Sequence, residues 1–457
     1  MKGLNKEILR LAIPSILANI TIPLVGIVDT AIAGHIPSDS GIQAATFIGA
    51  ISVGALLFDL IYWNFGFLRS GTGGLTAQAY GASNPKECAR IFYRGIDLAL
   101  ALAFLTLSLQ WPFVKLALLV VDASPEVESL AAEYFFARVW AAPATVSLMT
   151  FSGWFVGMQD SVSSMWKDLI VNIMNIVSSL ILALGIGSWK GIGFLGVAWG
   201  TVIAQYSGLL YCIIKCRTKY STVLKHFRVS KVLEVFKGND FMSFFKMNVN
   251  LSLRSASFIA IYIGYTMIAA KYGDMMLACS SIMMELLMLF SYFTDGFAYA
   301  GEAMTGKYIG ASDRAMTKKT VKNVFIWSMS IAVAFIGIYK LAGVPLLHLM
   351  TSDESVVEAC RVFLPWLIFM PPLGCAAFTW DGIYLGATDS ASMRDSMVFA
   401  ALLFILSWFL FKWIWHPDGA LAIHLLLAAY FVHLLFRTVY LSVRYHRNIL
   451  DKPFRNN

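Results

Sequence analysis

The chain has 457 residues, of which 58% are hydrophobic and only 14% are charged, and its mean hydropathy is +0.69. Average soluble domains carry about 25% charged residues, so this composition excludes a soluble protein. The net charge of +8 could suit nucleic-acid binding, but the basic residues lie between apolar stretches rather than on one face. Many of these stretches reach the ~20 residues that span a bilayer core. The composition predicts a polytopic membrane protein that binds no nucleic acid.

The sequence lacks the motifs of soluble enzymes. Its six cysteines are scattered without a CxxC pair, its seven histidines form no HExxH motif, and it has no Walker motif. We therefore expect neither an enzyme nor a bound metal or cofactor. The N-terminal apolar run from Ile8 to Ile36 is too long for the core of a signal peptide, so it predicts a retained first span.

Twelve membrane-spanning helices are predicted, six on each side of a polar break, which makes the fold class an all-α polytopic membrane protein. Before the break we expect them near residues 11–34, 42–68, 95–119, 131–157, 163–187 and 192–214. After the break we expect them near 248–271, 275–300, 322–343, 358–386, 396–415 and 419–441. The predicted parts are an N-lobe at 1–217, a cytoplasmic linker at 218–240, a C-lobe at 241–443 and a cytoplasmic tail at 444–457.

The basic residues are distributed asymmetrically across these spans. When each is assigned to the nearer end of its span, 27 of the 35 Lys and Arg fall on one side and six on the other, while Arg138 and Arg254 lie within spans. Cytoplasmic loops of membrane proteins carry the excess of Lys and Arg. We therefore predict a multi-pass protein of the cytoplasmic (inner) membrane with both termini in the cytoplasm.

The linker at 218–240 is the longest polar stretch of the chain. Basic residues such as Lys225 and Lys231 alternate there with apolar residues such as Phe227 and Leu233. This pattern is typical of an amphipathic helix that lies on an anionic leaflet. Membrane lipids are therefore expected partners of the protein.

An internal repeat divides the chain into two similar halves. Three pairs of segments recur at one constant spacing, close to half the length of the chain: Tyr80–Asn84 with Ile309–Asp313, Gly153–Gly157 with Gly382–Gly386, and Pro143 with Pro372. Each half holds six spans, so both enter the bilayer in the same direction and form parallel repeats. In transporters with this plan, the substrate site lies between the lobes and access alternates by rocking. The repeat favours a transporter, although a channel can also be built from repeats.

Ionisable side chains inside a membrane are functional candidates, because a charge at the bilayer centre costs about 2.5–3.5 kcal/mol on insertion scales. The deepest candidate of the first half is Asp29, six residues after Pro23, which favours a bend in its helix. Desolvation favours the neutral form of a buried carboxylate, so Asp29 is a plausible proton or cation site. The alternative is an aspartate at a helix end that faces water.

Several other charged residues fall within or near predicted spans. In the first half these are Asp59 and Asp97, and an ion pair with Arg69 or Arg138 is as plausible as a transport role for them. In the second half the candidates are Arg254, Glu285, Asp295, Glu302 and Asp381. Asp295 and Glu302 share a helix face, where they could bind ions or close a gate. Asp381 has Ser152 as its repeat mate, so the two halves differ in chemistry.

Four segments together resemble the multidrug and toxic compound extrusion (MATE) family, and more narrowly its DinF-like branch. They are Phe65–Arg69, Gly74–Gly81, Asp295–Ala303 and Asp381–Thr388. The resemblance covers nearly the whole chain. It implies a twelve-helix, two-lobe antiporter that exports cationic or amphipathic compounds against an inward flow of protons or sodium ions.

The resemblance also implies roles for individual residues. Asp29 matches an acidic residue of the first helix that is proposed to bind the coupling ion, and Asp381 matches an acidic position of the tenth helix. Asn175 and Thr201 match polar cavity positions. Some relatives carry an aspartate four residues after the position of Asn175, where this chain has Ser179. A site with two carboxylates is therefore in doubt: either Asp29 works alone, or Asp59 or Asp97 substitutes.

The leading hypothesis is a secondary active antiporter for small organic cations or amphipathic compounds, acting as a monomer and coupled to protons in preference to sodium. Protonation of Asp29 would let the Pro23 region bend and expel the substrate. The alternative is a flippase for lipid-linked precursors from the same wider superfamily. A flippase needs several arginines inside the spans to bind pyrophosphate, and only Arg138 and Arg254 are counted there.

Overall fold

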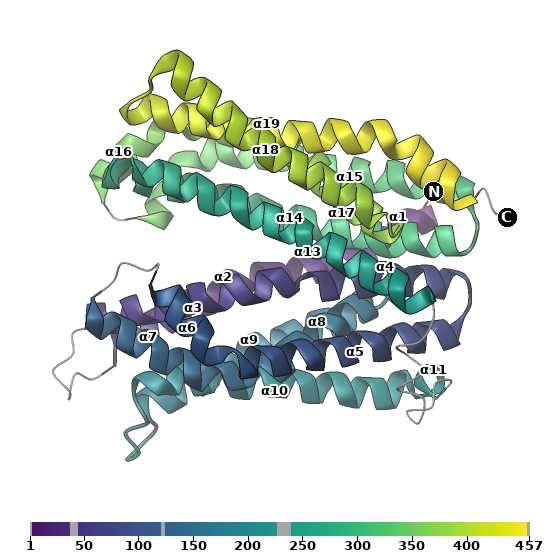
Figure 1. Ribbon diagram of the computed structural model, residues 1–457, viewed down its shortest axis with the longest axis horizontal. Helices are drawn as coiled ribbons and strands as arrows, with labels where there is room; N and C mark the ends of the chain where they lie inside the picture. Colours follow the sequence, from purple (N-terminus) through teal and green to yellow (C-terminus); the bar gives the residue numbers. More distant parts are fainter. Residues whose placement is uncertain (1, 37–43, 120–123, 226–238, 352, 455–457) are drawn as a thin grey trace. The chain divides into compact units, whose positions relative to one another are not determined.

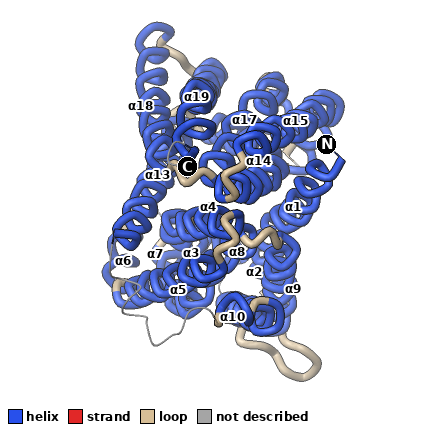
Figure 2. The backbone as a smooth tube through the Cα atoms, turned by 90° about the vertical axis from the view of Figure 1, so that its right-hand side faces the viewer, coloured by secondary structure: helices blue, strands red, loops and turns tan. Residues whose placement is uncertain are grey.

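The computed structural model describes residues 2–36, 44–119, 124–225, 239–351 and 353–454. Helices account for nearly all of these residues. The only β pairing within the described ranges is one bridge between Ile186 and Trp189. Figure 2 shows the helices, connected by short loops. The predicted all-α class is confirmed.

The helices of the first half follow one another from purple to teal in Figure 1. In chain order they are α1 (Lys2–Ile20), α2 (Ile22–Gly34), α3 (Ala44–Phe65), α4 (Phe67–Gly81), α5 (Pro85–Ser108), α6 (Gln110–Leu118), α7 (Pro125–Arg138), the short 3-10 helix η1 (Val139–Ala141), α8 (Ala142–Gly157), α9 (Ser161–Leu184), α10 (Phe194–Lys219) and α11 (Ser221–Leu224).

The helices of the second half run from teal to yellow in Figure 1. They are α13 (Asn239–Ala270), α14 (Asp274–Gly310), α15 (Arg314–Met350), α16 (Glu354–Arg361), α17 (Leu364–Gly386), α18 (Ser390–Trp415), α19 (Gly419–Tyr445), the π-helical η3 (His446–Asp451) and the 3-10 helix η4 (Lys452–Phe454).

The number of spans agrees with the prediction. Within the described ranges, eleven helices are long and apolar enough to cross a membrane, and some of them join two consecutive elements, such as α3 with α4. The pair α16 and α17, bent by 61°, makes a twelfth span. The bend lies where Pro365 begins the second helix, because proline cannot donate to the helix ladder and is tolerated at a first turn. Twelve spans are therefore confirmed.

The chain forms two compact units. The N-unit holds Leu17–Thr76 and Asn84–Phe241, and the C-unit holds Met242–Asn457 together with Met1–Ile16 and Ala77–Ser83. The start of α1 and the end of α4 thus pack in the C-unit. There Lys307 Nζ lies 3.1 Å from Glu7 Oε2, and the Gln78 side chain donates to the Gly386 carbonyl at 2.8 Å.

Four turns with one geometry confirm the internal repeat. In each turn, a residue with positive φ precedes a side chain that caps the next helix by accepting from a backbone N–H. The residues with positive φ are Ser83 and Ser312 in one repeat pair and Gln159 and Thr388 in the other. The caps are Asn84, Asp313, Asp160 and Asp389. The constant spacing of the repeated segments therefore reflects two copies of one backbone plan.

The glycines of the repeated segments permit close helix contacts. A Cβ atom at Gly153 would lie 2.1 Å from the Arg69 carbonyl oxygen in the N-unit. A Cβ atom at Gly382 would lie 2.0 Å from the Ala298 carbonyl oxygen in the C-unit. The two contacts are repeat mates, since the same shift along the chain relates both pairs of positions. Only glycine fits such backbone-to-backbone packing.

Several helices extend beyond the apolar stretches that predicted them. The span expected at 42–68 continues through α4 to Gly81, and the span expected at 275–300 continues along α14 to Gly310. Hydropathy marks the part of a helix that fits the hydrocarbon core, and it carries no signal for turns that lie outside that core. The predicted helix ends were therefore too short at these places.

The predicted linker is only partly described. Residues 218–225 complete α10 and form the short helix α11. Residues 226–238, which hold most of the predicted amphipathic segment, lie outside the described residues.

Candidate functional site

The first predicted site residue, Asp29, is a buried carboxylate on α2. Asp29 is 7% exposed, and its carboxylate has no hydrogen bond or ion pair to any described residue. The helix is interrupted about two turns before it, between Ile20 and Ile22, where Pro23 stands in the first turn of α2. Asn172 donates to Thr21 Oγ1 at 2.5 Å and fixes this interruption against α9. The structure thus places the break where the sequence predicted a bend.

Arg138, at the end of α7, is the cationic side chain that interacts electrostatically with Asp29. Its guanidinium donates to the Tyr134 hydroxyl at 3.0 Å and lies over the Phe58 ring at 4.7 Å. It interacts electrostatically with both Asp29 and Asp59, although Asp59 itself is exposed. The group of two carboxylates and one guanidinium carries a net charge of −1. One bound proton would bring that charge to zero.

Asn175 and Thr201 lie together in the N-unit. Asn175 Nδ2 donates to Thr201 Oγ1 at 2.9 Å, and Asn175 Oδ1 is buried without a hydrogen-bond partner among the described residues. Tyr134 lies between Thr201 and Arg138 and connects this pair to the charged group. Ser179 is fully buried against the Val197 carbonyl, so this position supplies no second carboxylate.

The fourth predicted site residue, Asp381 on α17, is held by two arginines of the C-unit. Its Oδ2 accepts from Arg254 Nη2 of α13 at 2.5 Å and from Arg437 Nη2 of α19 at 2.6 Å. The Arg437 side chain is only 1% exposed. Two guanidinium groups therefore share one carboxylate, which leaves a net charge of +1.

Several polar nitrogens around Asp381 are unsatisfied. They are buried without a hydrogen-bond partner among the described residues: Arg437 Nε and Nη1, Arg254 Nε and both ring nitrogens of His433. The distribution of basic residues along the sequence places Arg437 at the cytoplasmic end of its span, and the structure corrects this: Arg437 is buried and contacts Asp381. The signal that could have revealed it was the position of Arg437 inside the apolar stretch 419–441.

The remaining candidates of the first half do not join the Asp29 group. Asp97 is half-buried on α5, with its Oδ2 unsatisfied. Arg69, on α4, donates to Ser70 Oγ at 3.4 Å. Of the pairings that the sequence suggested, the one between Arg138 and Asp59 occurs as an electrostatic interaction.

The remaining candidates of the second half all lie on α14. Glu285 is exposed, Asp295 is half-buried and Glu302 is fully buried. A Cβ atom at Gly386 would lie 2.4 Å from the backbone carbonyl oxygen of Glu302, so this part of α14 packs tightly on α17. A role in ion binding or gating for these three residues stays a prediction.

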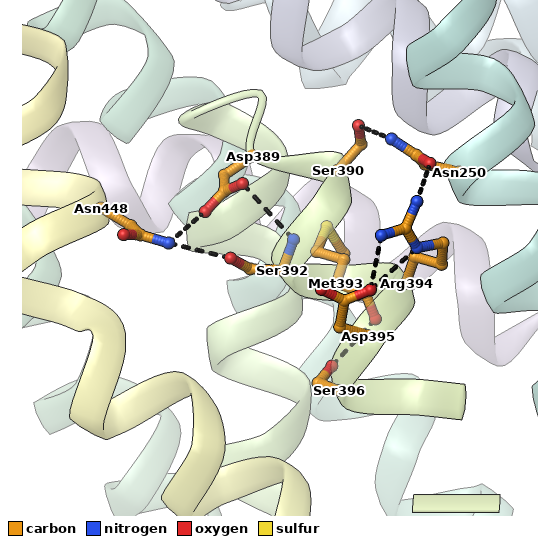
Figure 3. Close-up of polar contacts among 9 residues, drawn as sticks. All are labelled: Asn250, Asp389, Ser390, Ser392, Met393, Arg394, Asp395, Ser396 and Asn448. Atoms are coloured by element: carbon orange, nitrogen blue, oxygen red, sulfur yellow. Dashed lines mark hydrogen bonds and ion pairs between the residues drawn. The ribbon is translucent and has the colours of Figure 1, made fainter. Parts of the chain in front are cut away.

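Polar contacts also hold the turn before α18 in the C-unit, as Figure 3 shows. Asn448 donates to Asp389 Oδ2 at 2.7 Å and to Ser392 Oγ at 2.8 Å. On the other side of the same helix, Asn250 donates to Ser390 and accepts from Arg394 at 2.8 Å. These contacts tie the start of α18 to α13 and to the end of the chain.

The matching turn of the N-unit is held by a charge. Asp160 Oδ2 accepts from Lys219 Nζ, from the Tyr220 hydroxyl and from Ser163 Oγ, each at 2.6 Å. Burial acts to raise the pKa of Asp160, but hydrogen bonds from Lys219, Ser163 and Tyr220 outweigh burial and hold the pKa below its usual value of 3.8. Lys219 and Asn448 are repeat mates, as are Asp160 and Asp389.

A metal site is not formed by these groups. Searching the described ranges finds no cluster of three or more His, Cys, Asp or Glu side chains able to hold a metal ion. The charged groups that the fold assembles are the Asp29 group of the N-unit and the Asp381 group of the C-unit.

Comparison with known proteins places this geometry in context. The family described as MatE matches residues 14–181 and 251–413. "DNA damage-inducible protein F" of Escherichia coli is 32% identical over 425 residues, which cover 93% of this chain and 90% of that protein. "Probable multidrug resistance protein NorM" of Caulobacter vibrioides is 24% identical over 441 residues, which cover 90% and 85%.

Solved structures share the fold. One described as "Crystal structure of MATE in the bent conformation" has a TM-score of 0.83 and 18% identity, and the match covers 98% of this chain and 96% of that one. A transporter of the MOP superfamily from Pyrococcus furiosus, described by a "reverse polarity of binding pocket", also has a TM-score of 0.83, at 17% identity over 96% of each chain.

Proposed function

Since the chain belongs to the MatE family of multidrug and toxic compound extrusion transporters, we propose that it is a secondary active antiporter that exports cationic or amphipathic organic compounds in exchange for protons. Sodium is the alternative coupling ion. The observation that carries the proposal is the buried carboxylate of Asp29, which has no hydrogen-bond or ion-pair partner among the described residues.

An unpartnered carboxylate inside a membrane is unstable unless a cation neutralises it. A proton and an organic cation can each do so at Asp29, and they compete for the same charge. Exchange follows from this competition, provided that each ligand binds the two conformations with different affinity. Asn175 and Thr201 add polar contacts beside the carboxylate, and the aromatic rings of Phe58 and Tyr134 border its guanidinium neighbour.

We propose that the conformational change is a tilt of α2 at the interruption of the first span. Thr21 and Pro23 leave the helix ladder incomplete, and this section lies about two turns from Asp29. Neutralising Asp29 weakens its attraction to Arg138 and lets α2 tilt at this point. We propose the lobes 1–217 and 241–443 as the moving parts, joined by the linker 218–240, with both termini in the cytoplasm and the chain acting as a monomer in the cytoplasmic membrane.

The test is efflux of a fluorescent organic cation from proteoliposomes with an imposed pH gradient. The Asp29→Asn variant should lose pH-driven transport to the background of empty vesicles, because asparagine cannot exchange a proton. Glu133→Gln, an exposed residue of α7, removes the same charge and should transport normally. Transport by Asp29→Asn at the wild-type rate would refute the mechanism. Transport driven by a sodium gradient alone would mean that sodium, and not the proton, is the coupling ion.

The flippase alternative gains one observation from the structure. Arg94 and Arg437, both buried, join Arg138 and Arg254 within the spans, so the count of two from the sequence is too low. Three of these arginines interact with carboxylates of their own unit, however. Arg254 and Arg437 share Asp381, and Arg138 faces Asp29 and Asp59. A pyrophosphate group needs more than the net charge of +1 that the C-unit group offers, so drug export remains the better supported function.

A further inference from the structure

A cavity of about 740 Å³ lies in the N-unit, outside the charged groups. Helix α8 forms its floor, α5 and α10 form its walls, and α11 closes one end by packing against both walls. Figure 1 shows these four helices near one another. The proposed transport cycle gives this cavity no role.

The walls are two facing apolar stripes. On α5 the stripe is Phe92, Ile96 and Leu100, and on α10 it is Leu209 and Ile213. Residues four apart lie on one face of a helix, and eight residues span about 12 Å at 1.5 Å per residue. The groove is therefore nearly as long as one leaflet of a ~30 Å hydrocarbon core is deep. Such a groove fits an acyl chain.

The end closed by α11 is polar and basic. Arg217 continues the α10 stripe one turn beyond Ile213, and Ser221 and Lys225 lie beside it. Arg217 and Lys225 are both exposed, and neither has an ion pair within the described part of the chain. Nearby carboxylates are already engaged: Asp160 by Lys219, and Glu87 by Arg90. Among the described residues, the two cations therefore have no carboxylate partner.

We propose that this groove binds an anionic phospholipid, with its phosphate at Arg217, Lys225 and Ser221 and one acyl chain along α5 and α10. A basic end excludes the cationic compounds of the proposed export function, so the groove is a separate site. Basic residues next to a span attract anionic headgroups, and the hydroxyl of Ser221 adds a hydrogen-bond donor for a phosphate oxygen.

The position of the site suggests its consequence. The lipid would contact α10 and α11 on either side of Lys219 and Tyr220, which hold Asp160 at the turn before α9. α9 carries Asn175, so a lipid seated here braces the helix that lies beside the proposed coupling residue.

The test is native mass spectrometry of the purified full chain titrated with phosphatidylglycerol or phosphatidylcholine. The Arg217→Gln/Lys225→Gln variant should bind phosphatidylglycerol about 30-fold more weakly, because two cations that attract the headgroup are removed. Lys190→Gln/Lys271→Gln removes the same charge elsewhere and should bind like the wild type. Equal binding by both double variants, or an equal loss in both, would overturn the proposal.

A second variant separates the groove from surface electrostatics. Ile213→Trp fills the apolar wall without changing charge, and it should weaken phosphatidylglycerol binding several-fold. Unchanged binding would mean that no acyl chain enters the groove. Inorganic phosphate at millimolar concentration should not displace the lipid, and displacement would indicate a phosphate site instead. Elution as a single species and an unchanged melting temperature establish that each variant is folded.

Discussion

The two units share one backbone plan but place their charged residues at different points of it. The N-unit carries Arg138, Asn175 and Thr201, whose repeat mates in the C-unit are Leu367, Phe404 and Tyr430, all packed in an apolar core. The C-unit carries Asp381 and Arg437, whose mates in the N-unit are Ser152 and Gly208. The residues of each candidate site therefore have no counterpart of the same chemistry at the matching positions of the other unit.

The comparison separates residues that determine backbone geometry from residues that determine chemistry. The capping side chains and the close-packed glycines agree between the repeats, because each turn and each helix crossing needs the same local geometry. The ionisable groups differ. The Asp29 carboxylate of the N-unit has no hydrogen bond or ion pair to any described residue, whereas the Asp381 carboxylate of the C-unit is held by two arginines. We infer that the first is free to bind ligands and the second stabilises the fold.

The difference between the two units is tested most directly by removing each carboxylate in turn. Asp381→Ala should lower the free energy of unfolding by about 3–5 kcal/mol, since it leaves two guanidinium groups uncompensated in the membrane. Asp29→Asn should leave stability nearly unchanged while it stops transport. Thermal melting in detergent measures both variants. Equal stability of Asp29→Asn and Asp381→Ala would remove the distinction between the two units.

A double variant sharpens the same point. Asp381→Leu combined with Arg437→Leu should recover part of the stability lost by Asp381→Leu alone, because replacing a buried ion pair by apolar residues is often close to neutral. The coupling energy from the double-mutant cycle measures the interaction between the two side chains. A coupling energy near zero would mean that Arg254 alone compensates Asp381.

The glycine contacts should behave alike in the two units. Gly153→Ala and Gly382→Ala each add a methyl group that collides with a backbone carbonyl, and such overpacking typically costs about 1–3 kcal/mol. We expect similar drops in melting temperature for both. Gly26→Ala, where an added Cβ meets nothing within 4 Å, is the matched control and should change little. A large difference between the two repeat mates would contradict their structural equivalence.

The smallest expected effect concerns the two turns held by Asp160 and Asp389. Asp160→Asn should cost about 2 kcal/mol, as expected for hydrogen bonds to a charged group, and Asp389→Asn should cost less, because its donors Asn448 and Ser392 are neutral.

The pH dependence of the Asp160 contribution follows from its lowered pKa. The stabilisation is complete above the unfolded value of 3.8 and is lost as the pH falls through the lower folded value. The difference in melting temperature between wild type and Asp160→Asn should therefore be constant at neutral pH and shrink below pH 3.8. A difference that shrinks already between pH 8 and pH 6 would show that another group is responsible.

Much of the architecture could be predicted from the sequence, because its signals are local. Each of the twelve apolar stretches and each of the repeated segments is a run of neighbouring residues, which can be recognised without knowing how the helices pack. The predicted helices were too short at ends such as Gly81 and Gly310, because the helix continues there beyond the hydrocarbon core and hydropathy gives no signal for it. The four candidate residues Asp29, Asn175, Thr201 and Asp381 could also be named in advance.

Their partners could not be named in advance. Arg437 reaches Asp381 across 56 residues of sequence, and Arg138 acts on Asp29 from another helix. Such contacts depend on how each helix is rotated and packed, which a linear pattern of hydropathy does not specify. The sequence by itself determined that a few carboxylates lie within membrane spans. Only the tertiary structure decided that Asp29 has no hydrogen bond or ion pair to a described residue while Asp381 is held by two arginines, because pairing is a property of packed helices.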